Sequence, residues 1–172
     1  MRPAAKILFL LTAALALAQA TWHYLHLPET VAIHFDLAGQ ANGWSSRGAH
    51  FAMQAGLAVF LGALFGSGGW LLRRVPDQFI NIPHRDYWLA PERRAATCRA
   101  LDSMFSAVGI VVMGFFVVLF QQVYVANLTG TLTLKLMPLI IGQFVFVVGL
   151  ISIMMFRFRP PAQPDPRSRR RS

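Results

Sequence analysis

The sequence is poor in charged residues and contains a single cysteine. Only 13% of its 172 residues are Asp, Glu, Lys or Arg, whereas 55% are hydrophobic. Soluble globular domains carry about 25% charged residues. Cys98 is the only cysteine, so no internal disulfide can form. This composition excludes an ordinary soluble domain and indicates a protein embedded in a lipid bilayer.

Charge is missing altogether from four long apolar runs. They cover residues 7–25, 51–72, 104–126 and 136–156. Each run is close to the ~20 residues that a helix needs to cross the hydrocarbon core. We therefore predict an all-α integral membrane protein, with one domain, residues 1–158, forming a four-transmembrane-helix bundle. Residues 159–172 are rich in Pro and Arg and are expected to form a disordered, basic cytoplasmic tail.

The basic residues are distributed unevenly around these runs. Of the 16 Lys and Arg residues, only Arg47 and Lys135 lie in the first and third connecting segments. Cytoplasmic segments carry the Lys/Arg excess, so we predict a multi-pass protein of the inner (plasma) membrane with both termini cytoplasmic. This topology explains the net charge of +9 without nucleic acid. Anionic lipid headgroups on the cytoplasmic side are the expected partners.

The N-terminus allows two interpretations. Arg2, Lys6 and the sequence Ala18-Gln19-Ala20 are typical of a cleavable signal peptide. Hydrophobic residues continue past that point through Trp22 and Leu25, however, which makes the run long enough to span. We expect a retained first span. Cleavage would leave three spans with unchanged orientation.

The segment between the first two runs contains a strand pattern. Residues 30–37 alternate between apolar and more polar side chains, and Gly39, Asn42 and Gly43 follow as turn residues. The other strand-like segment on this side is 128–134. We expect these two segments to pair into a small extracytoplasmic two-stranded β cap resting on the helix ends.

The segment between the second and third runs is broken by prolines. Pro91 and Glu92 indicate a helix start, from which one helix is expected to continue into the third run. Tyr87 and Trp88 are expected at headgroup level. The arginines expected to face lipid phosphates are Arg93, Arg94 and Arg99.

Polar side chains within the runs are few. Gln143 is expected to bond across helices, whereas Gln121 and Gln122 are expected to be hydrated near the outer interface. Four histidines are expected on the outer side: His23, His26, His34 and His50. With Glu29 and Asp36 they offer a zinc site, but their spacing matches no standard signature. We favour a structural His34–Asp36 pair and predict no metal site.

Motifs for catalysis and transport are lacking. The sequence has no HExxH, no GxSxG and no Gly-rich phosphate loop. An inner cluster of His84, Asp86 and Glu92 is better explained as a salt-bridged surface. Coupled carriers place ionisable groups inside their spans, and Asp, Glu, Lys and Arg are absent there. We expect no enzyme activity, no catalytic residue and no cofactor.

Two motifs resemble a known family. The outer-loop motif comprises Leu27, Pro28, His34, Phe35, Gly39, Gly43 and Trp44. The inner-loop motif comprises Asn81, Pro83, Tyr87, Trp88, Pro91, Glu92 and Arg93. Together they resemble a bacterial membrane family called domain of unknown function 1648. His34 is the polar exception in an otherwise structural outer motif, and is our first candidate for a functional residue.

The resemblance implies a role only by association. Some members of the family carry this domain beside that of Sdp-type immunity proteins, which protect a cell from a secreted peptide toxin. The present sequence lacks the inner motif of the immunity domain, Asn-x-x-x-Gly-Tyr-Arg-Thr. Our first hypothesis is a non-enzymatic accessory, sensing or immunity-type component with a protein or peptide partner. The alternatives are a small transporter or oligomeric pore, or an enzyme using His34 and Asp36.

Overall fold

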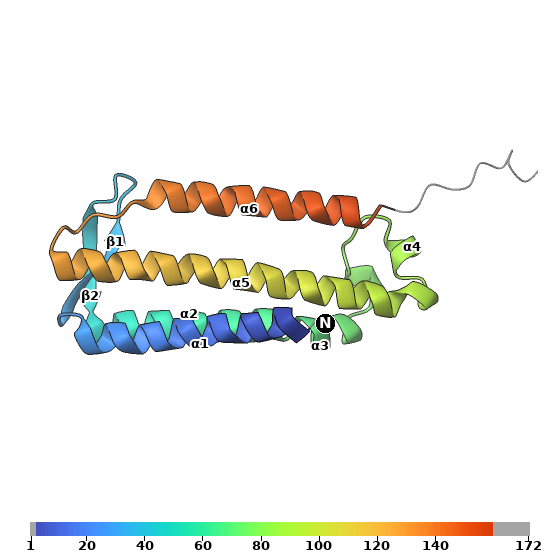
Figure 1. Cartoon of the computed structure of the whole chain (residues 1–172), viewed down its shortest axis with the longest axis horizontal. Coiled ribbons are helices and arrows are strands. Elements are labelled where there is room, and N and C mark those ends of the chain that lie inside the picture. The colour runs from blue at the N-terminus through green and yellow to red at the C-terminus, as the bar shows by residue number, and fades with distance from the viewer. Residues whose placement is uncertain (1–2, 160–172) are drawn as a thin grey trace, which may run out of the picture.

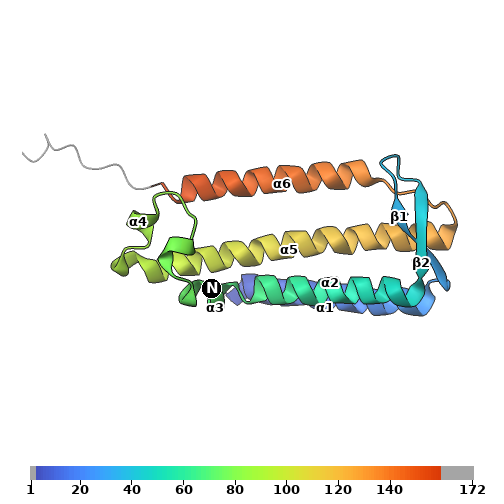
Figure 2. The same cartoon turned by 180° about the vertical axis from the view of Figure 1, so that it is seen from behind.

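The computed structural model describes residues 3–159 and is mostly α-helical. Its four long helices are α1 (Pro3–His26), α2 (Arg47–Gly66), α5 (Pro91–Thr129) and α6 (Leu136–Arg157). They run along one common axis, as Figures 1 and 2 show. Each is apolar and long enough to cross a membrane, which confirms the four predicted spans. Of the predicted tail, 159–172, only residue 159 is among the described residues.

Three of the long helices pack into one core. Helices α1, α2 and α5 contact one another, and Phe9, Leu61 and Met113, one from each, are buried where they meet. A Cβ at Gly109 of α5 would lie 2.7 Å from both the Phe65 Cβ and the Phe9 ring. Small residues let helices pack closely in lipid, and Gly109 here makes room for two aromatic side chains against the α5 backbone.

Helix α6 stands apart from this core. Figure 1 shows it along the opposite side of α5 from α1 and α2. Across Leu136–Arg157 no residue is buried. An apolar cavity of about 370 Å³ lies between α3, α5 and α6, with Phe105, Leu150 and Met154 in its lining. The helix is therefore present as predicted, but it is packed loosely.

One end of the bundle, here called the hairpin end, carries a small sheet. Strands β1 (Thr30–Phe35) and β2 (Ala41–Ser46) pair antiparallel, joined by a turn in which Gly39 has φ +81°. A two-stranded sheet was predicted correctly, but its pairing was wrong. The segment 128–134 contributes only an isolated bridge, Gln40 with Thr133.

The physical reason for the different pairing is Asn127 of α5. Its side chain accepts from the Ala32 N–H at 2.8 Å and donates to the Ala32 C=O at 3.0 Å. These two bonds occupy the edge of β1 at which a third strand would pair. The neighbouring segment 41–46 also closes a much shorter loop than 128–134 does, which costs less chain entropy.

The other end, here called the loop end, holds short elements between α2 and α5. They are α3 (Gly68–Arg74), the 3₁₀ turn η1 (Asp77–Phe79) and α4 (Arg85–Trp88). The second predicted span, 51–72, is thus interrupted at Ser67, and α2 begins earlier, at Arg47. Helix α5 starts at Pro91 as predicted and is 39 residues long. At 1.5 Å per residue it measures about 58 Å, so it extends well beyond the bilayer core.

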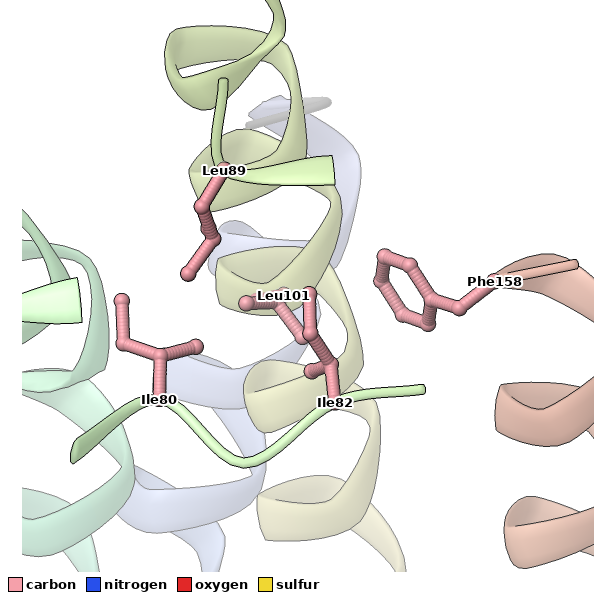
Figure 3. Packing of buried hydrophobic residues seen from close by; sticks show 5 residues of the cluster. All are labelled: Ile80, Ile82, Leu89, Leu101 and Phe158. Carbon is pink, nitrogen blue, oxygen red and sulfur yellow. The ribbon is translucent and has the colours of Figure 1, made fainter. Parts of the chain in front are cut away.

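The loop end also fixes the last turn of α6. Figure 3 shows the cluster of Ile80, Ile82, Leu89, Leu101 and Phe158, which joins the segment before α4 to α5 and to the end of α6. The Trp88 indole N–H donates to the Phe158 carbonyl at 2.6 Å. We call this cluster together with Trp88 the loop-end clamp.

Candidate functional site

The most unusual feature of the bundle is a group of polar side chains buried between α1, α2 and α5 near the hairpin end. His23, His50 and Gln54 are only 1%, 2% and 3% exposed. The Gln54 amide nitrogen lies 3.1 Å from Nδ1 of His23 and 3.2 Å from Nε2 of His50. Because an amide nitrogen only donates, both ring nitrogens act as acceptors. Each ring then carries its single proton on its other nitrogen.

The group continues to the surface between α1 and α5. Nε2 of His23 lies 3.3 Å from Oε1 of Gln121, which also accepts from Nε2 of Gln19 at 3.1 Å. Gln19 donates to the Val117 carbonyl as well, at 2.9 Å. We call His23, His50, Gln54, Gln121 and Gln19 the His–Gln network. It joins α1, α2 and α5 near the hairpin end.

Two fully buried side-chain atoms of the network have no hydrogen-bond partner within residues 3–159. They are Nδ1 of His50 and Oε1 of Gln54. The rings also make aromatic contacts: His23 stacks on Tyr124 with centroids 4.3 Å apart, and Phe120 meets His50 edge-on at 5.8 Å. The network is therefore rigidly held, but its hydrogen bonding is incomplete.

The predicted roles of the glutamines have to be corrected. Gln121, expected to be hydrated, forms the cross-helix bonds. Gln122 accepts from the Lys135 backbone N–H at 3.1 Å and so holds the start of α6. Gln143, expected to bond across helices, has no hydrogen bond in the described part of the chain because α6 stands away from its neighbours.

The predicted histidine groupings also have to be corrected. His26 is exposed and contacts only its own helix, at the Trp22 carbonyl, so it does not share a site with His23. His34 bonds to Asn42 rather than to Asp36, whose carboxylate accepts from the Gln40 N–H at 2.9 Å. Asp36 does not pair with His34 because its carboxylate stabilises the turn of the hairpin. Among residues 3–159, no three His, Cys, Asp or Glu side chains are placed to hold a metal.

Beside the network lies a cavity of about 330 Å³, here called the hairpin-end cavity. Its lining is mostly apolar and comes from the hairpin, α2, α5 and the start of α6. It includes Met53, Phe116, Leu119, Phe120 and Leu136 together with His34 and His50. Mostly apolar pockets of a few hundred Å³ with a small number of polar groups are typical of binding sites. His34, the first candidate from the sequence, thus lies at this cavity.

The outer-loop motif builds the hairpin that roofs the cavity. Leu27 is 2% exposed, and its carbonyl accepts from Nη1 of Arg47 at 3.0 Å. Pro28 follows the end of α1. A Cβ at Gly43 would lie 2.9 Å from the His34 Cβ, and one at Gly39 would lie 2.2 Å from the Leu134 carbonyl oxygen. Phe35 packs on the cluster of Val123, Ala126 and Leu134, whereas Trp44 is 56% exposed.

The inner-loop motif builds the opposite end of the molecule. Nε of Arg93 donates to the Tyr87 carbonyl at 2.7 Å, and its guanidinium lies over the Tyr87 ring. The Thr97 hydroxyl donates to the Trp88 carbonyl at 2.8 Å. Asn81 is exposed, Pro83 precedes α4, and Pro91 opens α5. The two motifs are therefore not brought together.

Three acidic residues at the loop end, Asp77, Asp86 and Glu92, form ion pairs. Asp86 lies 3.5 Å from Arg85, and Glu92 lies 3.0 Å from Arg93. Asp77 accepts from Nε of Arg94 at 2.8 Å. This agrees with the salt-bridged surface expected for Asp86 and Glu92. It also means that Arg93 and Arg94, expected to face lipid phosphates, are at least partly engaged by protein groups.

Four apolar helices, each long enough to span, place this chain among multi-pass membrane proteins. Residues 8–57 match the model of a family described as domain of unknown function (DUF1648). The predicted resemblance is thereby confirmed over most of α1, the hairpin and the first half of α2. The inner-loop motif lies outside the matched residues. No curated protein and no solved structure gives a significant match to the chain.

Sequence reasoning overlooked the His–Gln network, although a signal for it exists. Gln19 and His23 are four residues apart on α1, as are His50 and Gln54 on α2. This spacing places each pair on one helix face. Polar pairs inside or beside apolar runs point to a helix interface. The prediction considered the four outer histidines only with one another and with Glu29 and Asp36, and so missed their pairing with glutamines.

Proposed function

We propose that this protein is a non-enzymatic component of a bacterial inner membrane, of the accessory, sensing or toxin-immunity type, which acts through a protein or peptide partner. The loop end and both termini face the cytoplasm, and the hairpin faces outward. The Lys/Arg excess around the loop end supports this orientation. The first span is retained, because Phe9 and Gln19 would otherwise be lost from the core and the network.

The observation that carries the proposal is the hairpin-end cavity beside a loosely packed α6. The cavity is mostly apolar, lies under the hairpin, and has the buried His50 ring in its wall. An apolar side chain of a membrane-active peptide that approaches from the outer side suits such a lining. Because no residue of α6 is buried, that helix can shift to admit a larger segment without breaking a packed core.

The immunity version is tested by deleting the gene and challenging the cells with secreted peptides from neighbouring strains. Deleted cells should become sensitive, and the wild-type gene should restore protection. Leu119→Trp, which fills the cavity from α5, should fail to restore protection. Val125→Trp is the matched control, because Val125 is 46% exposed on the same helix. Sensitivity that is unchanged by the deletion would dismiss the immunity version.

One observation favours the alternative of a small transporter or oligomeric pore. The His–Gln network places uncharged polar groups inside the bundle, where they are costly and often functional. The network is followed toward the loop end by the buried apolar residues Phe9, Leu61 and Met113. A flux of ions or small solutes into liposomes that is lost in Gln54→Leu would support transport. The absence of flux with the wild-type protein would exclude the transporter or pore alternative.

A further inference from the structure

A second, more polar cavity of about 600 Å³ lies at the loop end, where α3 meets the first turns of α5. Its charged lining residues are Arg73, Arg94, Arg99 and Asp102. Gly69 and Cys98 form much of the remaining wall. The cavity thus presents both signs of charge, and it is separate from the His–Gln network at the other end of the bundle.

Asp102 is the unusual member of this group. The residue is only 9% exposed, and its carboxylate lies against Gly69, where an added Cβ would come within 2.6 Å of it. Within residues 3–159, no basic side chain forms a salt bridge with this carboxylate and no donor bonds to it. The side chain is thus mostly buried, but its carboxylate remains open to the cavity that it lines. Its place in the cavity wall points to a ligand that brings a cationic donor.

The arginines provide the complementary half of the site. Arg94 is held in position by Asp77, through Nε at 2.8 Å, and by the Val75 carbonyl, through Nη2 at 3.3 Å. A guanidinium has five N–H donors, so those of Nη1 remain available. Neither Arg73 nor Arg99 forms a salt bridge within the described residues. Arg94 is thus preorganised to bind a phosphate, and the exposed Arg73 and Arg99 line the same cavity.

The depth of the cavity identifies the source of such a ligand. Arg99 and Asp102 are the last charged residues of α5 before the apolar run 104–126. Within α3, Arg73 directly follows the apolar residues 68–72. The cavity therefore lies where the hydrocarbon core gives way to lipid headgroups. A headgroup at this depth can reach the cavity with its acyl chains still in the bilayer.

We propose that this cavity binds the headgroup of phosphatidylethanolamine. The phosphate is held by Arg73, Arg94 and Arg99, and the primary ammonium donates hydrogen bonds to Asp102. Phosphatidylglycerol brings the phosphate but no cation for Asp102. Phosphatidylcholine brings a cation that is bulkier and has no N–H to donate. The site is thus selective for a lipid that carries both groups, and the proposal does not depend on the identity of the outer partner.

The test is binding of three dioleoyl lipids, one with each headgroup, to the purified full chain in detergent, followed by native mass spectrometry. The wild type should bind phosphatidylethanolamine about tenfold more tightly than phosphatidylcholine, the ratio expected for one charge-assisted hydrogen bond. It should also prefer phosphatidylethanolamine to phosphatidylglycerol. Equal or tighter binding of either competitor by the wild type would overturn the proposal.

Variants separate the two halves of the site. Asp102→Asn should bring the phosphatidylethanolamine to phosphatidylcholine ratio to within about twofold, because only one of these lipids uses the carboxylate. Asp86→Asn is the matched control: its side chain is 97% exposed at the same end of the molecule, so the ratio should stay at the wild-type value. An equal change in both variants would show a bulk charge effect and overturn the site.

Arg99→Gln provides a test that does not disturb the buried carboxylate. Arg99 is exposed, so the variant should fold normally. It should weaken the binding of all three lipids several-fold, because all three share the phosphate, and should leave their ratios unchanged. Unaltered affinity for all three lipids would contradict the proposed position of the phosphate.

Discussion

The two sides of α5 differ in how they are packed. On one side α5 meets α1 and α2 through Gly109, the buried Met113 and the bonds of Gln121. On the other side α6 runs alongside without one buried residue across Leu136–Arg157. Gly142 and Gly149 of α6 face open space, with no neighbour close to where their Cβ atoms would stand. Small residues thus affect packing only where a neighbouring helix places a group against them.

This difference follows from the physics of helices in lipid. Lipid tails are as apolar as Leu or Phe, so apolar side chains provide no hydrophobic driving force for two helices to associate. The core side of α5 has close packing of Phe9 and Phe65 at Gly109 as well as cross-helix hydrogen bonds, and among the described residues the α6 side has neither. The position of α6 is fixed at its ends instead, by the loop-end clamp and by the bond of Leu134 N–H to the Gly39 carbonyl at 2.9 Å.

The largest expected effect comes from filling the tight side of α5. Gly109→Leu places a side chain where even a Cβ would lie 2.7 Å from Phe9 and Phe65. We expect a loss of at least about 3 kcal/mol in the free energy of unfolding, because neither ring can move without opening the core. Unfolding in mixed micelles measures it. Gly114→Leu is the control, since a Cβ added at Gly114 would have no neighbour within 4 Å. Equal losses of stability in the two variants would contradict the proposed difference in packing between the two sides of α5.

The next effect concerns the attachment of the hairpin to the tight side. Asn127→Ala removes both side-chain bonds to Ala32, whose backbone is fully buried. We expect a loss of about 2 kcal/mol, because a buried N–H and a buried C=O are left without partners. Hydrogen exchange at the Ala32 amide should become much faster. Asn81→Ala, at an exposed residue, should leave the stability unchanged; protection of Ala32 that survives Asn127→Ala would contradict the assigned role.

The four spans and the start of α5 could be predicted because local properties determine them. An apolar run of spanning length has to be helical in lipid, and Pro91 with Glu92 marks a helix start without help from any neighbour. The hairpin turn was visible in the same way, from Gly39 and Asn42. These features depend on residues close together in the sequence.

The pairing of β1 and the composition of the site could not be predicted in this way. Whether 128–134 or 41–46 pairs with β1 depends on Asn127, which lies 95 residues from Ala32. Gln143 and Gln121 are the same residue type in similar apolar surroundings, and only the distance of α6 from α5 distinguishes them. Such outcomes depend on tertiary placement, and a single sequence does not encode that placement in any local pattern.

A smaller effect on stability is expected when a glutamine of the packed side, Gln54, is compared with Gln143 of α6. Gln54→Leu removes the donor that joins His23 to His50, and we expect a loss of about 1 kcal/mol, since cross-helix hydrogen bonds in membranes average about 0.6 kcal/mol. Gln143→Leu should change the free energy of unfolding by less than about 0.5 kcal/mol. Both are measured by unfolding in the same micelles. A larger loss of stability for Gln143→Leu than for Gln54→Leu would contradict the proposal that the α6 side of α5 is the more loosely packed one.

The smallest effect on global stability is expected at the loop-end clamp. Trp88→Phe keeps an aromatic ring against Phe158, whose ring centroid lies 5.6 Å from that of Trp88, but removes the bond to the Phe158 carbonyl. Because α6 buries nothing along its length, we expect unfolding of the three-helix core to change by only about 0.5 kcal/mol. Hydrogen exchange in the last turn of α6 should nevertheless rise clearly, whereas α2 should keep its protection.

Trp70→Phe is the matched control for this substitution. Trp70 is 54% exposed on α3 and contacts Arg74, so its replacement should leave exchange in α6 at the wild-type rate. If Trp88→Phe instead destabilised the whole core while the end of α6 stayed protected, the clamp would belong to the core rather than to α6. The observed geometry argues against that result, because the Trp88 indole bonds to the residue that directly follows α6. A helix that is held mainly at its two ends can move in its middle part, as the proposed displacement of α6 by a larger segment requires.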